Sequence, residues 1–178
     1  LDVRRSGIKA INLLKGDELK WVKSVKEGGE VVLVSKAGQS IHFSSSDIRT
    51  MSRGARGVKG INLKSGDELV FMDILESGSS LLVLSENGYG KSTSIEQYKL
   101  QKRGGRGIKT LSINDKVGQV ATGLVLQEKE ESDLVATSTH GQVIRIKVGS
   151  IPSMGRDTQG VRLMRLNQGD KIASIIKV

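Results

Sequence analysis

Residues 101–107 read Gln101-Lys102-Arg103-Gly104-Gly105-Arg106-Gly107, and Ile108-Lys109-Thr110-Leu111 follows them directly. Three glycines would weaken a helix or a strand, so the first seven residues predict a loop, and the alternation in the next four predicts a strand. Looser copies of this junction precede Val58 and Val161, and the chain opens on a truncated copy. Their closing glycines lie 50, 50 and 53 residues apart, at Gly7, Gly57, Gly107 and Gly160. The sequence therefore predicts a repeat protein.

Each repeat contains four short apolar runs separated by turn residues, a pattern typical of an antiparallel four-stranded sheet. In the first repeat these runs are residues 7–13, 19–25, 31–35 and 39–43. The second repeat has matching runs at 57–63, 69–74 and 81–85, whereas the third is less regular. We predict repeat units at about 7–56, 57–106 and 107–159, with a partial unit at 160–178. Helix is expected only as single turns, near residues 47–51 and 95–100.

The third run of a repeat is apolar at every position, as in Val31-Val32-Leu33-Val34 and Leu81-Leu82-Val83-Leu84. A strand without alternation is buried on both faces, so each predicted sheet must lie between two others. Sheets that repeat every 50 residues and stack face to face form blades around an axis. We therefore predict an all-β fold, a propeller-like disc with about three and a half repeats. The constant period disfavours the alternative, a β-sandwich of irregular strands.

The composition favours a polyanionic partner. The 178 residues include 28 Lys and Arg against 19 Asp and Glu, which gives a formal net charge of +9. The absence of cysteine excludes disulfides, thiolate metal sites and cysteine nucleophiles. Aromatic residues make up only 3%, which argues against a stacking surface for single-stranded nucleic acid. No apolar run is long enough to span a bilayer, and the chain starts at Leu1, so we expect a piece of a longer soluble protein.

The sequence resembles the C-terminal domain of the bacterial DNA gyrase A protein, and the likeness covers the whole chain. Residues 101–107 are similar to the gyrase-A box of that family, which has Gln, two basic residues, two glycines, a basic residue and a glycine. The preceding stretch, from Gly88-Tyr89-Gly90-Lys91-Ser92 to Tyr98-Lys99, is similar to the family's blade-joining loop. The resemblance implies a β-pinwheel, a propeller-like disc of six blades in which neighbours exchange a strand.

The resemblance also implies a function. The disc of this family wraps duplex DNA on its rim and supports ATP-dependent negative supercoiling by a type II topoisomerase. The implied partners are duplex DNA, the remainder of the gyrase A protein and the gyrase B protein, and the implied location is the cytoplasm, at the nucleoid and without membrane contact. Tyrosine cleavage and ATP turnover belong to other domains of that enzyme. This chain is therefore expected to be non-catalytic and to need no cofactor or metal.

Two features differ from the family pattern. The box usually belongs to the first blade, whereas two basic repeats precede it here, and the chain holds three and a half units instead of six. The chain is therefore expected to correspond to later blades of such a disc. Two alternatives stay open: the corresponding C-terminal domain of topoisomerase IV, which has a degenerate box and fewer blades, and a propeller-type protein-interaction platform.

Basic residues recur at the predicted blade junctions. Arg53, Arg103 and Arg156 occupy equivalent positions, and so do Lys59, Lys109 and Arg162. A curved cationic stripe can hold duplex DNA through its phosphates, and adjacent glycines let the loop backbone approach them. We predict DNA contacts from the box-like residues Gln101, Lys102, Arg103, Gly104, Gly105, Arg106 and Gly107. Further contacts are predicted from the cations Arg4, Arg5, Lys9, Arg49, Arg53, Arg56, Lys59, Lys99, Lys109, Arg156 and Arg162.

No other pattern in the sequence supports catalysis or cofactor binding. Gly90-Lys91-Ser92-Thr93 is similar to the end of a phosphate-binding P-loop, but that motif needs glycine at position 85, which is Ser85. It also needs a following helix, whereas the repeat predicts a strand. His42 and His140 lack partners at metal-ligand spacing, so both are predicted to be surface residues, with His140 in a turn.

Overall fold

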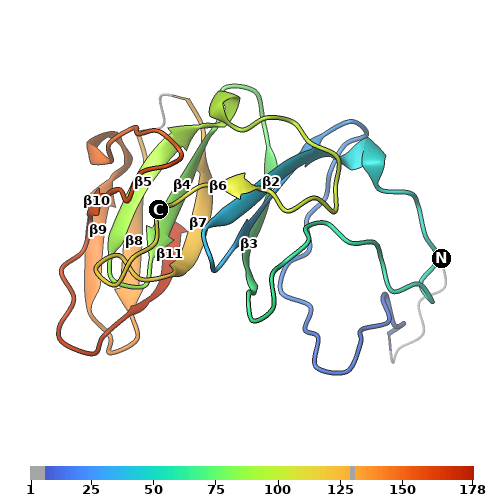
Figure 1. Cartoon of the computed structure of the whole chain (residues 1–178), viewed down its shortest axis with the longest axis horizontal. Coiled ribbons are helices and arrows are strands. Elements are labelled where there is room, and N and C mark those ends of the chain that lie inside the picture. The colour runs from blue at the N-terminus through green and yellow to red at the C-terminus, as the bar shows by residue number, and fades with distance from the viewer. Residues whose placement is uncertain (1–6, 129–130) are drawn as a thin grey trace.

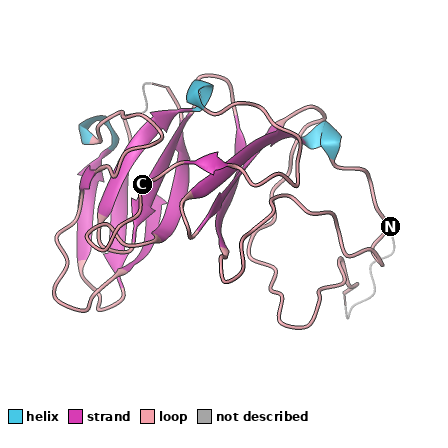
Figure 2. Ribbon diagram, in the orientation of Figure 1, coloured by secondary structure: helices cyan, strands magenta, loops and turns pink. Residues whose placement is uncertain are grey.

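Apolar runs bounded by glycine turns give the chain its strands (Figures 1 and 2). The computed structural model describes residues 7–128 and 131–178. In this part of the chain the strands are β1 Glu30–Ser35, β2 Gln39–Ser44, β3 Leu69–Leu75, β4 Ser80–Ser85, β5 Tyr89–Ser94, β6 Ile108–Lys109, β7 Val120–Leu126, β8 Asp133–Ser138, β9 Val143–Lys147, β10 Val161–Arg162 and β11 Ile172–Lys177. Single 3-10 turns follow three of them, at Ser45–Asp47, Ile95–Gln97 and Val148–Ser150. The predicted all-β class and the scarcity of helix are confirmed.

Three antiparallel sheets stand side by side. The first has the order β3-β1-β2-β6, the second β10-β5-β4-β7, and the third β11-β8-β9. The hairpins β1–β2 and β4–β5 form the centres of the first two sheets, and the hairpin β8–β9 forms the third sheet with β11, with β9 at its edge. Each hairpin turn holds a glycine with positive φ, which glycine adopts without steric cost: Gly38 (φ 75), Gly88 (φ 80) and Gly141 (φ 84).

The strands of one sheet come from three successive repeats. In the first sheet the hairpin belongs to the first repeat, β3 to the second and β6 to the third; in the second sheet, every contribution moves on by one repeat. The four runs of one repeat therefore lie in different sheets, not in the single sheet that their order predicts. Exchange places each apolar hairpin strand between two neighbours and links adjacent sheets through the chain itself.

Three runs that the sequence predicts as strands, residues 7–13, 19–25 and 57–63, are not paired into any sheet within the described residues. This corrects the prediction. In the first sheet, β3 and β6 pair with a hairpin that belongs to the repeats one and two before their own. By the same pattern, 19–25 and 57–63 would pair with a hairpin about 50 residues before β1–β2, at positions that precede Leu1. Without a ladder, the run 19–25 stays exposed, with 79% of Val22 accessible to solvent.

Two apolar layers join the three sheets. Leu81 and Val83 of β4 face the first sheet and pack near Val32 and Val34, whereas Leu82 and Leu84 face the third. All four side chains of β4 have no solvent exposure, which confirms the predicted burial on both faces. Burying each of them stabilises the fold by about 1.5–3 kcal/mol relative to exposure. The sheets therefore form one continuous stack.

The strands are ordered from an inner side to an outer side of the stack. Strand β7 lies against both β3 and β11, so these three strands converge on the inner side. The short strands β6 and β10 lie at the opposite edges of their sheets. We call that outer side, which carries β6, β10 and the loops 101–107 and 154–160, the rim. Among the described residues, no helix is long and apolar enough to cross a membrane.

Candidate nucleic-acid interface

The box-like loop, residues 101–107, is held in place by backbone hydrogen bonds to the first repeat and to the first run of the second. The N–H of Gln101 donates to the carbonyl of His42 at 2.8 Å, and Asn62 donates its N–H to the carbonyl of Gly105 at 2.8 Å. Gly107 has φ 73, and a Cβ at this position would collide with the carbonyl oxygen of Ser40. The glycines are therefore needed for close packing of the loop against its neighbours as well as for its turn.

Arg103 points into this packing. Its Nε donates to the carbonyl of Asp47 at 2.8 Å, and its Nη1 donates to the carbonyl of Lys59 at 3.1 Å. Arg156, at the equivalent position of the next loop, donates from Nη1 to the carbonyl of Lys109 at 3.1 Å. Both side chains are partly buried. These recurring arginines therefore fasten the loop at the end of a repeat to the first run of the same repeat.

Other predicted cations carry carboxylate or polar partners. Lys102 Nζ lies 2.9 Å from a carboxylate oxygen of Asp47, and Lys109 Nζ lies 3.0 Å from Asp157. Lys59 donates to the side-chain oxygen of Asn62 at 3.3 Å. The lysines are exposed at the surface, so these contacts are weak and exchange readily with solvent or with a phosphate.

A third group of cations is exposed and makes no ion pair or side-chain hydrogen bond within the described part of the chain. It contains Lys9, Arg49, Arg53, Arg56, Lys99 and Arg106. Arg106 is the cation of the box-like loop that remains open to a ligand. Arg4 and Arg5 lie outside the described residues.

Arg162 and Lys116 both lie close to the aromatic ring of Tyr89. Arg162 lies 5.2 Å from the ring centroid of Tyr89 and donates from Nη2 to the phenol oxygen at 2.7 Å; the ammonium of Lys116 lies 5.5 Å from the same centroid. Such cation–π contacts orient charged groups at a surface. Lys116 is not among the predicted contact residues. The sequence does carry a signal for it, because a lysine two residues before a turn glycine also occurs at Lys64.

Lys91, in the middle of β5, is fully buried. Its ammonium donates to the carbonyl oxygens of Gly155 and Arg156 and to the hydroxyl of Thr158, so it supports the loop 154–160 from beneath. Burial is the main cause that lowers the pKa of Lys91 to about 8; the charge of Asp157 opposes the shift, and the charge of Arg156 adds to it. The predicted strand at the P-loop-like stretch is confirmed, and its lysine serves the fold of a rim loop.

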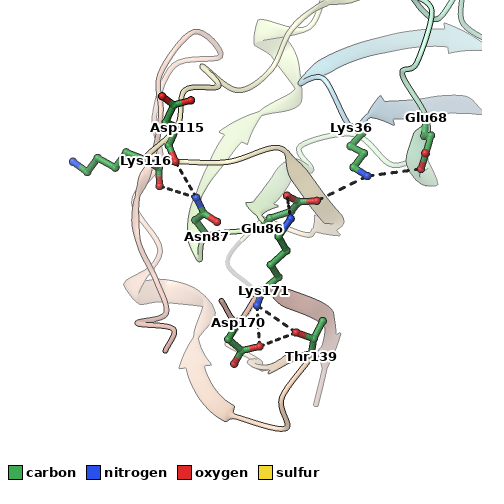
Figure 3. Close-up of polar contacts among 9 residues, drawn as sticks. All are labelled: Lys36, Glu68, Glu86, Asn87, Asp115, Lys116, Thr139, Asp170 and Lys171. Carbon is green, nitrogen blue, oxygen red and sulfur yellow. Dashed lines mark hydrogen bonds and ion pairs between the residues drawn. The ribbon is translucent and has the colours of Figure 1, made fainter. Parts of the chain in front are cut away.

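A chain of polar contacts connects the three hairpin turns (Figure 3). Lys36 lies 3.9 Å from Glu86, and Glu86 lies 2.9 Å from Lys171. Backbone bonds run in parallel, from Ile172 N–H to the Glu86 carbonyl and from Val120 N–H to the Lys36 carbonyl, both at 2.9 Å. These contacts fix the spacing of the sheets and hence the spacing of the rim loops.

Asp170 ends this chain of contacts in the third sheet. Burial opposes its ionisation, but hydrogen bonds from Ser138, from Thr139 and from the backbone N–H groups of His140 and Lys171 lower its pKa to about 2. The hydroxyl of Thr139 donates to the carboxylate at 2.8 Å. Asp170 is therefore ionised at neutral pH and holds the turn before β11 against the hairpin turn of β8–β9.

His42 corrects the prediction for the histidines. It is buried, with Nδ1 at 3.1 Å from the Tyr98 carbonyl oxygen and Nε2 at 2.8 Å from a carboxylate oxygen of Glu30. The prediction of a surface position was wrong because the chain leading into residues 101–107 crosses this face of β2. His140 lies exposed in a turn, as predicted. In the described residues no group of His, Asp and Glu side chains could hold a metal ion.

The comparisons with known proteins agree with this architecture. The family model of the DNA gyrase C-terminal domain, β-propeller, matches residues 2–26, 29–76, 79–127 and 132–178. The DNA gyrase A protein of Halalkalibacterium halodurans is 52% identical over 177 residues, which are 99% of this chain and 21% of that protein. The chain thus spans about a fifth of the length of the curated relatives it matches.

Two solved structures share the fold. A DNA gyrase A C-terminal domain superimposes with a TM-score of 0.84 at 29% identity, over 97% of this chain and 58% of that one. The C-terminal domain of a DNA topoisomerase IV superimposes with a TM-score of 0.79 at 25% identity, over 85% of this chain and 47% of that one. The expected β-pinwheel is confirmed, and the chain belongs to the family of β-propeller domains found at the C-terminus of DNA gyrase.

Proposed function

We propose that this chain is the non-catalytic DNA-binding and DNA-wrapping module of a gyrase A protein, and that it holds duplex DNA by its sugar–phosphate backbone. The observation that carries the proposal is the recurrence of exposed cations without carboxylate partners at the junctions of successive repeats, including Arg53, Arg56, Lys99 and Arg106. Cations at this spacing along a curved edge neutralise phosphates without reading bases. The formal net charge of +9 acts in the same direction.

In this function the arginines of the rim loops have two different roles. Arg103 and Arg156 bind backbone carbonyls and shape the loops, whereas Arg106 and its exposed counterparts meet the phosphates. Lys102 and Lys109 exchange a carboxylate for a phosphate when DNA arrives. The glycines of residues 101–107 allow the duplex to come close to the loop backbone.

DNA that follows the rim must bend. Bending a short duplex costs several kcal/mol, and contacts distributed along several repeats offset this cost only when the repeats keep their spacing. The polar contacts among Lys36, Glu86 and Lys171 hold that spacing. In the complete enzyme, wrapping would act with the rest of the gyrase A protein and with the gyrase B protein in the cytoplasm. It would support ATP-dependent negative supercoiling without a cofactor or a catalytic residue from this chain.

The salt dependence of DNA affinity tests the proposal. If five or six phosphates are neutralised, the logarithm of the association constant falls against the logarithm of salt concentration with a slope of about −5. Changing Arg49, Arg53 and Arg56 to alanine together is expected to reduce the slope by about 2–3 and to leave the fold intact, because all three lie exposed outside the strands. The measurement is fluorescence anisotropy of a labelled duplex at several salt concentrations.

A control removes two cations that have carboxylate partners. Lys20 and Lys23 are paired with Glu18 and Asp73, so their joint change to alanine is expected to leave the slope nearly unchanged. A slope near zero for the unmodified chain, or equal effects of the two sets, would contradict DNA binding by the rim. That outcome would favour a protein-interaction platform.

A further inference from the structure

One of the three junctions between repeats carries an anion. The junctions, aligned on their closing glycines, are the loops 51–57, 101–107 and 154–160. The first contains two cations and the second three, whereas the third contains one arginine and one aspartate. Asp157 stands at the position of Gly104 in the box-like loop, and Gln159 stands at the position of Arg106. The third junction therefore has no formal net charge.

The carboxylate of Asp157 lies on a lysine that is predicted to contact DNA. One of its oxygens is 3.0 Å from Nζ of Lys109, and the hydroxyl of Ser112 donates to the same oxygen at 2.9 Å. These hydrogen bonds from Lys109 and Ser112 lower the pKa of Asp157, so the carboxylate is ionised at neutral pH. The place where a DNA phosphate would meet Lys109 thus already holds an anion.

The loop that carries Asp157 is fixed from two directions. Lys91 and Thr93 of β5 donate to its backbone carbonyls, and the N–H of Ser112 donates to the carbonyl of Thr158 at 3.0 Å. All of these partners are residues that the structure describes. Because the loop is held in this way, the carboxylate of Asp157 stays at the rim when its lysine turns to another anion.

The ion pair of the box-like loop has a different geometry. The Lys102 side chain is 90% exposed and that of its partner Asp47 only 20%, so this lysine can turn outward and leave its carboxylate below the surface. The Asp157 side chain is 66% exposed and that of Lys109 49%. At the third junction the anion is therefore more open to a ligand than the cation that it neutralises.

We propose that Asp157 competes with DNA phosphates for Lys109, so that the duplex is held less tightly at the third junction and leaves the rim there first. A phosphate that takes over Lys109 separates the carboxylate from its cation and places two like charges side by side, which is unfavourable. The loops 51–57 and 101–107 contain no anion. This inference rests on the proposed DNA binding and adds that the binding strength is graded along the rim.

Two substitutions of Asp157 remove the competing charge. Asp157→Asn keeps the size of the side chain and an oxygen that can accept from Ser112, and Asp157→Gly introduces the residue type that the box-like loop has at this position. The matched control is Glu76→Gln, in the exposed turn between β3 and β4, which removes the same charge elsewhere in the chain. It measures how much affinity increases from the higher net charge alone.

Fluorescence anisotropy of a labelled duplex at several salt concentrations measures the effect. Both substitutions of Asp157 are expected to raise DNA affinity by about three- to tenfold and to make the slope of log affinity against log salt more negative by about 1, because Lys109 then neutralises one more phosphate. Glu76→Gln is expected to raise affinity by less than about twofold and to leave the slope unchanged.

A double-mutant cycle shows whether the gain passes through Lys109. Lys109→Ala is expected to weaken DNA binding by about twofold in the unmodified chain and by about fivefold or more in the Asp157→Asn background, because only there is the ammonium without a competitor. A change in loop shape would not produce this coupling. Urea denaturation checks that the variants keep their stability, since an exposed ion pair contributes little to it.

The inference is overturned if the unmodified chain binds DNA with a steep salt dependence but Asp157→Asn and Glu76→Gln raise affinity equally; DNA binding itself then stands. It is also overturned if Lys109→Ala has the same effect in both backgrounds. A salt slope near zero for the unmodified chain and for every variant overturns the proposed function, and this inference with it.

Discussion

Cations that lie close together in the sequence make different contacts in this molecule. Arg103 and Arg106 both belong to the box-like loop, but Arg103 donates to the carbonyls of Asp47 and Lys59, whereas Arg106 is exposed. Lys91 illustrates the same point within β5, because its ammonium serves three oxygen atoms of another repeat. Rim cations therefore occur in two environments: some are bound to backbone carbonyls, and others are exposed.

Separate alanine substitutions distinguish these environments. Arg103→Ala is expected to lower the free energy of unfolding by about 1–2 kcal/mol, because the partly buried carbonyl of Asp47 and the exposed carbonyl of Lys59 lose a charged donor. Arg106→Ala is expected to change stability by less than about 0.5 kcal/mol and to reduce DNA bending. Urea denaturation measures the first effect, and energy transfer between dyes at the duplex ends measures the second. Equal stability losses in both variants would contradict the division.

The buried Lys91 predicts a pH dependence of stability. Its pKa is about 8 in the folded chain and 10.5 in its ordinary environment, so between these values the unfolded chain holds more protons than the folded one. Stability of the unmodified chain should therefore rise from pH 8 to pH 10.5 relative to Lys91→Met, by on the order of 2 kcal/mol. Urea denaturation of both proteins across this range measures the difference. If the stability of the unmodified chain falls relative to that of Lys91→Met as the pH rises from 8 to 10.5, the lowered pKa is contradicted.

At the scale of elements, strand exchange makes glycine at the start of a rim strand indispensable. Gly107 packs its α-carbon against the carbonyl of Ser40 just before β6, whereas Gly57 has a similar φ of 87 and open surroundings. The same residue type thus has a conformational role at both positions and a packing role at one.

A matched pair of substitutions isolates the packing role. Gly57→Ala and Gly107→Ala both place alanine at positive φ, but only the second forces a Cβ into a neighbouring backbone. Gly107→Ala is expected to lower the free energy of unfolding by about 1–3 kcal/mol more than Gly57→Ala. Thermal or urea denaturation gives the comparison. Equal losses would show that β6 can move away from β2 at no cost.

At the scale of the whole molecule, stability is unevenly distributed. The three sheets share two buried layers, whereas the described residues before β1 form no ladder and expose Leu19 and Val22. Segments with few buried contacts open at low free energy, and proteases cut them first. The stack of sheets is therefore expected to outlast its N-terminal segment.

Limited digestion with trypsin tests this expectation. The first cuts should fall in the two exposed segments without strands, after Lys15, Lys20, Lys23 or Lys26 and after Arg49, Arg53 or Arg56, before any cut within a strand. Mass spectrometry of early time points identifies the sites. Early cuts after Lys36, Lys91 or Lys171, which are tied into the sheets, would contradict a stack that remains folded.

The periodicity of glycines and apolar runs was sufficient to predict the all-β class, the stacked sheets and the hairpins, because turns and strand burial depend on near neighbours in the sequence. The same periodicity located the rim loops and their cations. It could not show which strands share a sheet, because exchange joins runs from three repeats. It also could not show that His42 is buried, or that Arg103 binds carbonyls 44 and 56 residues away. Those features depend on which distant backbone passes over each side chain, and only the tertiary structure places that backbone.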